Sequence, residues 1–219
     1  FPDDVTGSLA WARALGRAGV LTPDDARHID QALTEILELG VANPDVVSGA
    51  DEDVHSFVER LLVERLGDAG RRLHTGRSRN EQVSLDLRLY LRRRIPALHR
   101  AIAALVEALS SQASQAGDGL MPSYTHFRPA QPVLVAHFFL AHVAPLRRDF
   151  ERLTAARAEA DALPLGSGAI AGTSYAIDVD TLALIQNRIF NYRGCNVSTC
   201  HGSFSGNPPA ANLDLRPGA

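Results

Sequence analysis

Apolar residues recur every three or four positions along most of the chain, a pattern that predicts amphipathic helices. The first such segment covers residues 8–20. The second covers residues 22–39 and opens on Thr22, followed by a proline and two aspartates, which is a typical helix start. A third segment covers residues 54–67 with 3.6-residue spacing. The pattern therefore predicts three helices of ordinary length in the first third of the chain.

Two much longer helical patterns follow. One begins near Ser78 or Asn80 and keeps an apolar face for ~30–35 residues, or ~50 Å at helical rise, with Pro96 inside it. The other runs from residue 131 to about residue 162. The segments between and after them lack helical periodicity, and no strand-like alternation is evident. We predict a mainly α fold built as an extended bundle of long helices.

Composition changes near residue 186. Residues 1–186 contain two asparagines, whereas the shorter remainder contains five, together with both cysteines. A flexible natural tail and a tail foreign to the rest of the chain both explain this change, and the second explanation is favoured. We expect three regions: an N-terminal helical domain at 1–77, a partial long-helix bundle domain at 78–185, and an atypical tail at 186–219, either disordered or foreign.

Charge and composition exclude several classes of protein. The net charge of −3 does not favour nonspecific nucleic-acid binding. All 22 basic residues are arginines, which excludes lysine Schiff-base chemistry and the lysine-containing phosphate loop. No apolar run approaches the ~18–20 residues that span a bilayer, and no secretory leader is evident at Phe1. We expect a cytoplasmic protein without a membrane partner, and we expect further sequence before Phe1, which is not a methionine.

The densest polar cluster covers residues 74–80, directly before the first long helix. It holds Arg77, Arg79 and Asn80, with hydroxyl side chains between them. A helix N-terminus adds free backbone N–H groups and partial positive charge, so the cluster suits a carboxylate-rich or phosphate ligand. The alternative stays open that Ser78 or Asn80 only caps the helix and that the arginines are solvated.

A second polar cluster, Ser123-Tyr124-Thr125-His126, lies in the loop before the second long helix. Histidine titrates near neutral pH and can therefore transfer protons, and a neighbouring hydroxyl can hold a carboxylate oxygen. A lone histidine is more often structural, so both interpretations stay open.

A third cluster, residues 51–55, opens another helix. Its acidic residues are expected at a helix start, where they favour the helix dipole. Asp53 and His55 could instead hold a cationic or polar ligand group. Because residues two apart on a helix do not face the same way, they converge only if one of them precedes the first turn.

The glycine-rich segment at residues 166–173 does not match a dinucleotide fingerprint, because its third glycine comes one position too late and no strand precedes it. A substrate-facing loop or a plain connection fits better. His137 and His142 are five positions apart, a poor spacing for metal ligands. We therefore expect neither a metal nor a cofactor.

Five stretches together resemble the argininosuccinate lyase family of the fumarase/aspartase superfamily, in the order that the family shows. The most specific is the cluster His74–Asn80, which lies within a matching run that begins at Gly67-Asp68-Ala69-Gly70 and ends at Val83. The others are Asp4-Val5-Thr6-Gly7-Ser8, Asp51-Glu52-Asp53-Val54-His55, Met121-Pro122-Ser123-Tyr124-Thr125-His126 with Ala130-Gln131-Pro132, and Leu163-Pro164-Leu165-Gly166-Ser167-Gly168-Ala169. The resemblance covers about residues 4–184.

The resemblance implies a β-elimination that splits argininosuccinate into arginine and fumarate. Hydrogen-bond donors aimed at the doubly charged transition state would lower its barrier. By resemblance, His126 is a catalytic acid or base and Thr125 binds a substrate carboxylate. Gln131 is a weaker candidate contact.

The remaining implied positions precede the second long helix. Ser8, Arg79 and Asn80 resemble the family's binders of substrate carboxylates. Asp53 and His55 resemble its positions near the arginine-like end of the substrate.

The family's serine-containing loop, with its Met-Pro-x-Lys-x-Asn segment, is missing from this sequence. The resemblance therefore implies a bundle truncated within the central helical domain, and a chain that could be inactive alone. It also implies a homotetramer with active sites shared between subunits. Two alternatives stay open: a noncatalytic, crystallin-like helical protein of the same fold, and another fumarate-releasing lyase such as adenylosuccinate lyase.

Overall fold

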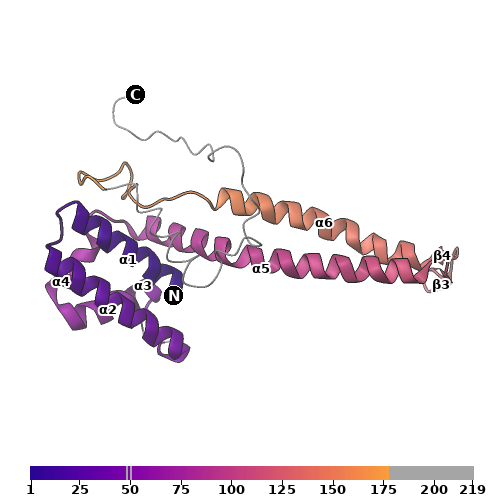
Figure 1. The fold of residues 1–219 in the computed structure, drawn as a ribbon, viewed down its shortest axis with the longest axis horizontal. Coiled ribbons are helices and arrows are strands. Elements are labelled where there is room, and N and C mark those ends of the chain that lie inside the picture. The colour runs from indigo at the N-terminus through magenta and orange to yellow at the C-terminus, as the bar shows by residue number, and fades with distance from the viewer. Residues whose placement is uncertain (48, 50, 178–219) are drawn as a thin grey trace, which may run out of the picture. The chain divides into compact units, whose positions relative to one another are not determined.

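The computed structural model describes residues 1–47, 49 and 51–177, and Figure 1 labels its elements. The described part is mainly helical, as the periodicity predicts. Its helices are α1 (Pro2–Arg17), α2 (Pro23–Ala42), α3 (Val54–Leu66), α4 (Asp68–Arg71), α5 (Arg79–Ala116) and α6 (Val135–Glu159), with the 3-10 turns η1 (Pro44–Val47) and η2 (Arg72–His74). Four two-residue strands complete the list: β1 (Leu120–Met121), β2 (Tyr124–Thr125), β3 (Arg128–Pro129) and β4 (Val133–Leu134).

The chain divides into two compact units. The first comprises Phe1–Leu89 together with the segment that starts at Ala162, and the second comprises Tyr90–Asp161. This division falls inside α5, because the first turns of that helix pack on α1 through Leu85 and Leu89. The domain boundary expected between residues 77 and 78 stays a prediction, and the expected tail at 186–219 lies outside the described residues.

Local capping signals set the ends of several helices. Thr22 caps α2 as predicted, its Oγ1 accepting a hydrogen bond of 3.1 Å from the Asp25 amide. Gly67 ends α3 with a φ of 56°, a conformation that favours glycine. In contrast, α1 begins at Pro2 and not near Ser8. Its first turn contains a proline and two buried aspartates. Because these residues are not apolar, the spacing of apolar residues does not predict a helix start there.

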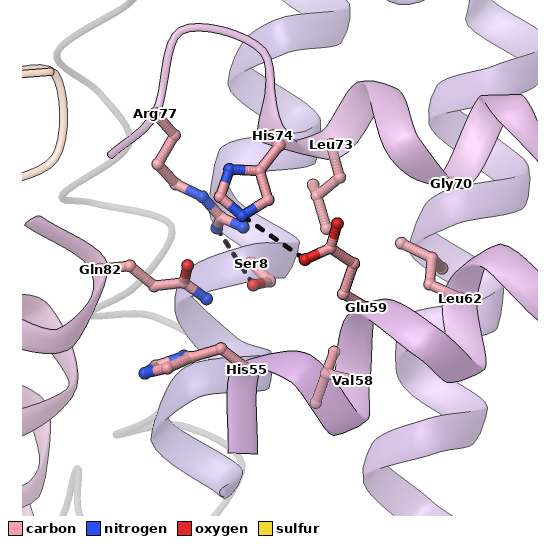
Figure 2. Close-up of a pocket in the computed structure, with 10 residues that line it drawn as sticks. All are labelled: Ser8, His55, Val58, Glu59, Leu62, Gly70, Leu73, His74, Arg77 and Gln82. Carbon is pink, nitrogen blue, oxygen red and sulfur yellow. Dashed lines mark hydrogen bonds and ion pairs between the residues drawn. The ribbon is translucent and has the colours of Figure 1, made fainter. Parts of the chain in front are cut away.

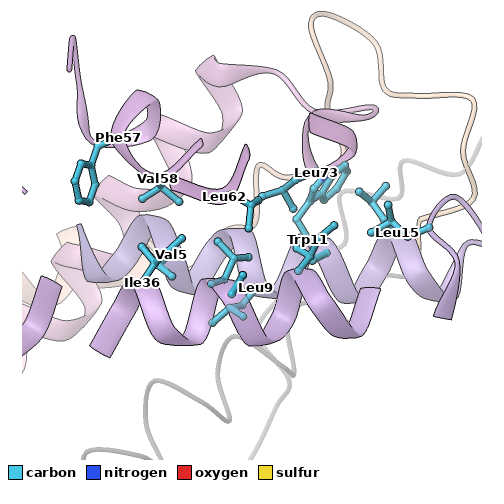
Figure 3. Packing of buried hydrophobic residues seen from close by; sticks show 14 residues of the cluster. Val5, Leu9, Trp11, Leu15, Ile36, Phe57, Val58, Leu62 and Leu73 are labelled. Carbon is cyan, nitrogen blue, oxygen red and sulfur yellow. The ribbon is translucent and has the colours of Figure 1, made fainter. Parts of the chain in front are cut away.

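The core of the first unit joins α1, α2 and α3 (Figure 3). Large side chains from all three helices are almost completely buried there. The close approach of α4 to α3 depends on Gly70, where a Cβ atom would lie 2.8 Å from the Leu62 carbonyl oxygen. The central members of this core are Leu9, Trp11, Leu15, Leu33, Ile36, Phe57, Val58 and Leu62.

The segment after α6 returns to the first unit. Leu163 and Leu165 pack against the small buried cluster of Ala10, Leu85 and Leu89. The start of α5 and the glycine-rich segment therefore share one surface of the first unit.

The second unit consists of the remainder of α5, the short strands and α6. The His99 ring of α5 stacks on the Phe150 ring of α6 with centroids 4.0 Å apart, so the two helices lie side by side within this unit. Pro96 lies inside α5, as the sequence predicts. None of the helices in the described residues has the length and apolar character needed to cross a membrane.

The segment between the two long helices is more ordered than the plain loop expected there. β1 pairs with β4, and β2 pairs with β3, both antiparallel. α6 consequently begins at Val135 and not at residue 131. The expectation of a segment without strands was wrong because two-residue strands are too short to show an alternating pattern.

Candidate active site

A small polar cavity lies in the first unit, where α1, α3 and the turn before α5 meet (Figure 2). Its volume is about 10 Å³, so it holds at most one water molecule. Its charged and polar lining consists of Ser8, His55, Glu59, His74, Arg77 and Gln82. The cavity is therefore part of a buried polar network and is too small to hold a substrate.

Arg77 is the buried cation of this network. Its side chain is only 9% exposed, and its Nη1 donates a hydrogen bond of 3.1 Å to the Ser8 Oγ. Its Nε has no hydrogen-bond partner among the described residues. Burial lowers the pKa of Arg77, whereas the negative charges of Asp4, Asp86 and Glu81 oppose that shift. An arginine stays protonated under such conditions, so Arg77 supplies a permanent positive charge that these carboxylates favour.

A carboxylate–imidazole cluster lies beside Arg77. The His55 Nδ1 is 2.7 Å from the Asp4 Oδ1 and 3.7 Å from the Asp86 Oδ2. The Gln82 Nε2 also donates to the Asp4 Oδ1. Burial opposes the charged form of His55, but the hydrogen bond with Asp4 and the charges of both aspartates outweigh it and raise the pKa of His55. The cluster ties α1, α3 and α5 together.

The same three side chains offer ligand atoms within 4.8 Å of one another, so they could hold a metal ion. A protonated His55 can balance the aspartate charge without a metal ion, because the proton on its Nδ1 places a positive charge at hydrogen-bond distance from Asp4. We therefore interpret Asp4, His55 and Asp86 as a buried ion-pair cluster.

This cluster predicts that stability falls as the pH rises. Burial raises the pKa of Asp86 to about 8, with the charge of Asp4 adding to the shift and His55 opposing it. The folded protein therefore keeps a proton between pH ~4 and ~8 that the unfolded chain releases, and stability decreases across that window. The raised pKa of His55 acts in the same direction, since its contribution is lost as the pH rises through the folded pKa.

We expect Asp86→Asn to flatten this decline in the free energy of unfolding, measured with urea between pH 5 and pH 9. Asp118→Asn, at an exposed turn, is the control and should keep the parent slope. Equal slopes in the parent chain and in Asp86→Asn would contradict the assignment.

Asp53 and Arg79 are brought together. Asp53 precedes the first turn of α3 and caps it, its Oδ1 accepting a hydrogen bond of 2.7 Å from the Ser56 amide. The Arg79 Nη1 lies 3.1 Å from both Asp53 carboxylate oxygens, and its Nη2 is 3.2 Å from the Glu59 Oε2. The hydrogen bond from the Ser56 amide holds the pKa of Asp53 below its usual range; burial opposes this, and Arg79 adds to it. His55, two residues further on, contacts Asp4 instead.

For residues 74–80, the sequence left open whether Ser78 or Asn80 only caps the helix and whether the arginines are solvated. Ser78 does cap α5, since its Oγ accepts from the Asn80 amide at 3.3 Å. The arginines are not simply solvated, because Arg77 is buried and Arg79 is paired with two carboxylates. Asn80 is exposed at the first turn of α5. His74 lies 3.7 Å from Glu59, and burial together with the charge of Arg77 lowers the pKa of His74.

Thr125, His126 and Gln131 belong to the second unit. Thr125 ends β2 and is paired with Arg128, so His126 and Phe127 form a two-residue turn. Both turn residues have positive φ, 48° and 62°, an arrangement that usually requires Asn or Gly. This strained tip presents His126 to solvent, and Gln131 is also exposed. Non-glycine residues in such conformations cluster at functional sites.

Several residues of the network were not selected from the sequence as site residues. They are Asp4, Glu81, Gln82 and Asp86, all of which are buried or half-buried. Only Glu81 has a local signal: it stands three residues after Ser78, the spacing of a capping box. The others gain their roles through contacts between segments distant in sequence.

The chain is similar to known lyases. A family model described as "Lyase" matches residues 2–204. Over 181 residues the chain is 43% identical to an argininosuccinate lyase of Alteromonas mediterranea, a match that covers 82% of this chain and 39% of that protein. The chain thus spans about two-fifths of the length of this relative.

Solved structures agree with this assignment. The structure resembles an EDDS lyase in complex with formate, with a TM-score of 0.69 and 26% identity over 84% of this chain and 36% of that chain. A 3-carboxy-cis,cis-muconate lactonizing enzyme from Pseudomonas putida has a TM-score of 0.60 and 20% identity over 87% and 43% of the two chains, a likeness of fold alone. The resemblance inferred from the sequence motifs is confirmed: the chain belongs to the lyase family and has the helical fold of fumarase/aspartase-type enzymes.

Proposed function

We propose that this protein cleaves argininosuccinate into arginine and fumarate by breaking a carbon–nitrogen bond. The observation that carries the proposal is the 43% identity to an argininosuccinate lyase over 82% of the chain. A variant of the similar EDDS lyase holds bound fumarate, which supports a fumarate-releasing reaction.

The ion pair at the start of α5 supports a substrate with both carboxylates and a guanidinium. Arg79 and Asp53 are 35% and 40% exposed, so a ligand can reach both side chains. A substrate that carries charges of both signs can exchange partners with this pair. Its carboxylate would bind Arg79 and Asn80, and its guanidinium would bind Asp53 near His55. Ser8 is buried against Arg77, so its proposed contact needs the largest rearrangement.

We propose that the hairpin tip supplies the acid–base chemistry. A base removes a proton from the carbon beside a carboxylate, and the C–H electrons form the new double bond. The C–N electron pair leaves with the arginine nitrogen, which receives a proton from His126. Thr125 would hold a substrate carboxylate, with Gln131 as a further contact. The proposed reaction uses neither a metal nor a cofactor.

We also propose that the protein works in the cytoplasm as a homotetramer. Apolar side chains on the long helices of the second unit support association, because Leu98, Leu105, Phe138 and Leu140 are each about half exposed.

Fumarate release from argininosuccinate, followed by ultraviolet absorbance, tests the proposed activity. The assay compares this chain with an extended protein, in which the matching C-terminal part of the Alteromonas mediterranea relative follows the chain. We expect turnover by the extended protein and little by the chain alone, because the family's serine-containing loop is missing from this sequence. Adenylosuccinate is the control substrate. No fumarate from argininosuccinate with either protein would contradict the proposal.

A further inference from the structure

Glu81 contacts its own helix start and a loop that begins 85 residues further along the chain. Its Oε1 accepts a hydrogen bond of 2.8 Å from the Ser78 amide, at the start of α5. Its Oε2 accepts from the Gly166 amide at 3.0 Å, the Ser167 hydroxyl at 3.0 Å and the Gly168 amide at 2.9 Å. The side chain is only 4% exposed. One buried carboxylate therefore serves both the helix start and the glycine-rich loop.

The loop is shaped to surround an anion. Gly166 and Gly168 have φ values of 102° and 59°, which lets their amides and the Ser167 hydroxyl point at one oxygen. Successive N–H groups arranged in this way form a concave site for negative charge. A side chain could not replace the hydrogen at Gly168, since a Cβ atom would lie 2.6 Å from the Gly172 carbonyl oxygen.

Within the described part of the chain, Glu81 provides the polar contacts that join this loop to α5. Other hydrogen bonds of the loop, such as Gly172 N to Ser167 O and Ser167 N to Pro164 O, lie within the loop itself. Leu163 and Leu165 pack on the buried cluster before the loop, but Ile170 is almost fully exposed. The centre of the loop is thus held to α5 mainly by Glu81.

We propose that Glu81 is a positioning residue, which locks the glycine-rich loop onto the start of α5 through its two carboxylate oxygens. Both oxygens must be acceptors, one for each segment. A glutamine in the same place would turn its NH₂ group toward donors on one side, so it could satisfy only one of the two segments. An aspartate is one methylene shorter and could cap α5, but it would not reach the loop.

Amide hydrogen exchange of the chain tests this lock without any need for activity. In Glu81→Gln we expect the exchange rate in residues 163–172 to rise by about tenfold or more, because charge-assisted hydrogen bonds are lost. Exchange in α1, α2 and α3 should stay within about twofold. Glu107→Gln, an exposed position on the same helix, is the control and should match the parent chain.

Two milder variants separate the lock from a general loss of stability. Ser167→Ala removes one loop donor and leaves the cap of α5 intact, so only the loop should exchange faster, and by less than in Glu81→Gln. Glu81→Asp should free the loop while the first turn of α5 stays protected. The proposal is overturned if the loop exchanges at the parent rate in Glu81→Gln, or if α1–α3 accelerate together with it.

The consequence for catalysis rests on the proposed function. In the extended protein, Glu81→Gln should raise KM for argininosuccinate by about tenfold with a smaller change in kcat. The substitution loosens the start of α5, where Arg79 and Asn80 are proposed to bind the substrate and not to react. If the extended protein shows no turnover, only the proposed function fails. The hydrogen-exchange measurement still tests whether Glu81 holds the loop on α5.

Discussion

Replacing His126 with asparagine in the extended protein should lower kcat for argininosuccinate cleavage by about 10²- to 10⁴-fold, the usual contribution of a general acid or base. The substitution suits the backbone at this position. His126 has a φ of 48° in a two-residue hairpin turn, and asparagine is favoured in that conformation. The hairpin should therefore persist, so that the loss reports on proton transfer. Steady-state fumarate release measures the effect.

The control for this experiment is His28→Asn, an exposed histidine on α2, which should leave kcat unchanged. The pH dependence adds a second readout. The pH–rate profiles of the parent and the variant should therefore differ in shape, whereas those of the parent and His28→Asn should coincide. A kcat within twofold of the parent would remove His126 from the mechanism.

Replacing Arg77 with methionine should lower the free energy of unfolding by about 3–5 kcal/mol, the typical cost of leaving buried charges without a partner. The negative charges of Asp4, Asp86 and Glu81 favour the charged form of Arg77, which also donates a hydrogen bond to Ser8. Methionine keeps much of the side-chain length, so lost charge and not lost volume dominates the effect. Urea denaturation of the parent chain and the variant at pH 7 measures the difference.

Arg79→Met is the matched control, since this arginine is two residues away and also pairs with carboxylates. Its partners Asp53 and Glu59 are about two-fifths exposed, so we expect a loss of at most about 1 kcal/mol. Equal losses in the two variants would show that burial does not determine how much these arginines contribute to the free energy of unfolding.

Much of the helical framework follows from the sequence. Thr22 and Gly67 define the ends of α2 and α3 because capping depends on residues close together in the chain. The long apolar period that begins near Ser78 predicts α5, since it repeats over many turns. The short motifs also identify the family, because several of them occur together in the order that the family shows.

Local patterns are weaker where an element is short or starts without an apolar rhythm. For that reason the sequence pattern predicts neither the start of α1 at Pro2 nor the two-residue strands β1–β4. The same limit applies to Asp53 and His55. Their spacing shows that they diverge if both are helical, but it cannot show which partner each one meets.

Only the tertiary structure assigns these partners. Arg77 and Arg79 have identical side chains in one short cluster, yet the first is buried against Ser8 and the second is half-buried beside Asp53. The sequence predicts Glu81 as part of a helix cap. Its contact with the loop at Gly166–Gly168 joins positions 85 residues apart, which no local pattern predicts. Helix formation depends on neighbours in the chain, so the sequence alone determines the framework. Burial and charge pairing depend on which distant segments pack together, and the tertiary structure alone decides them.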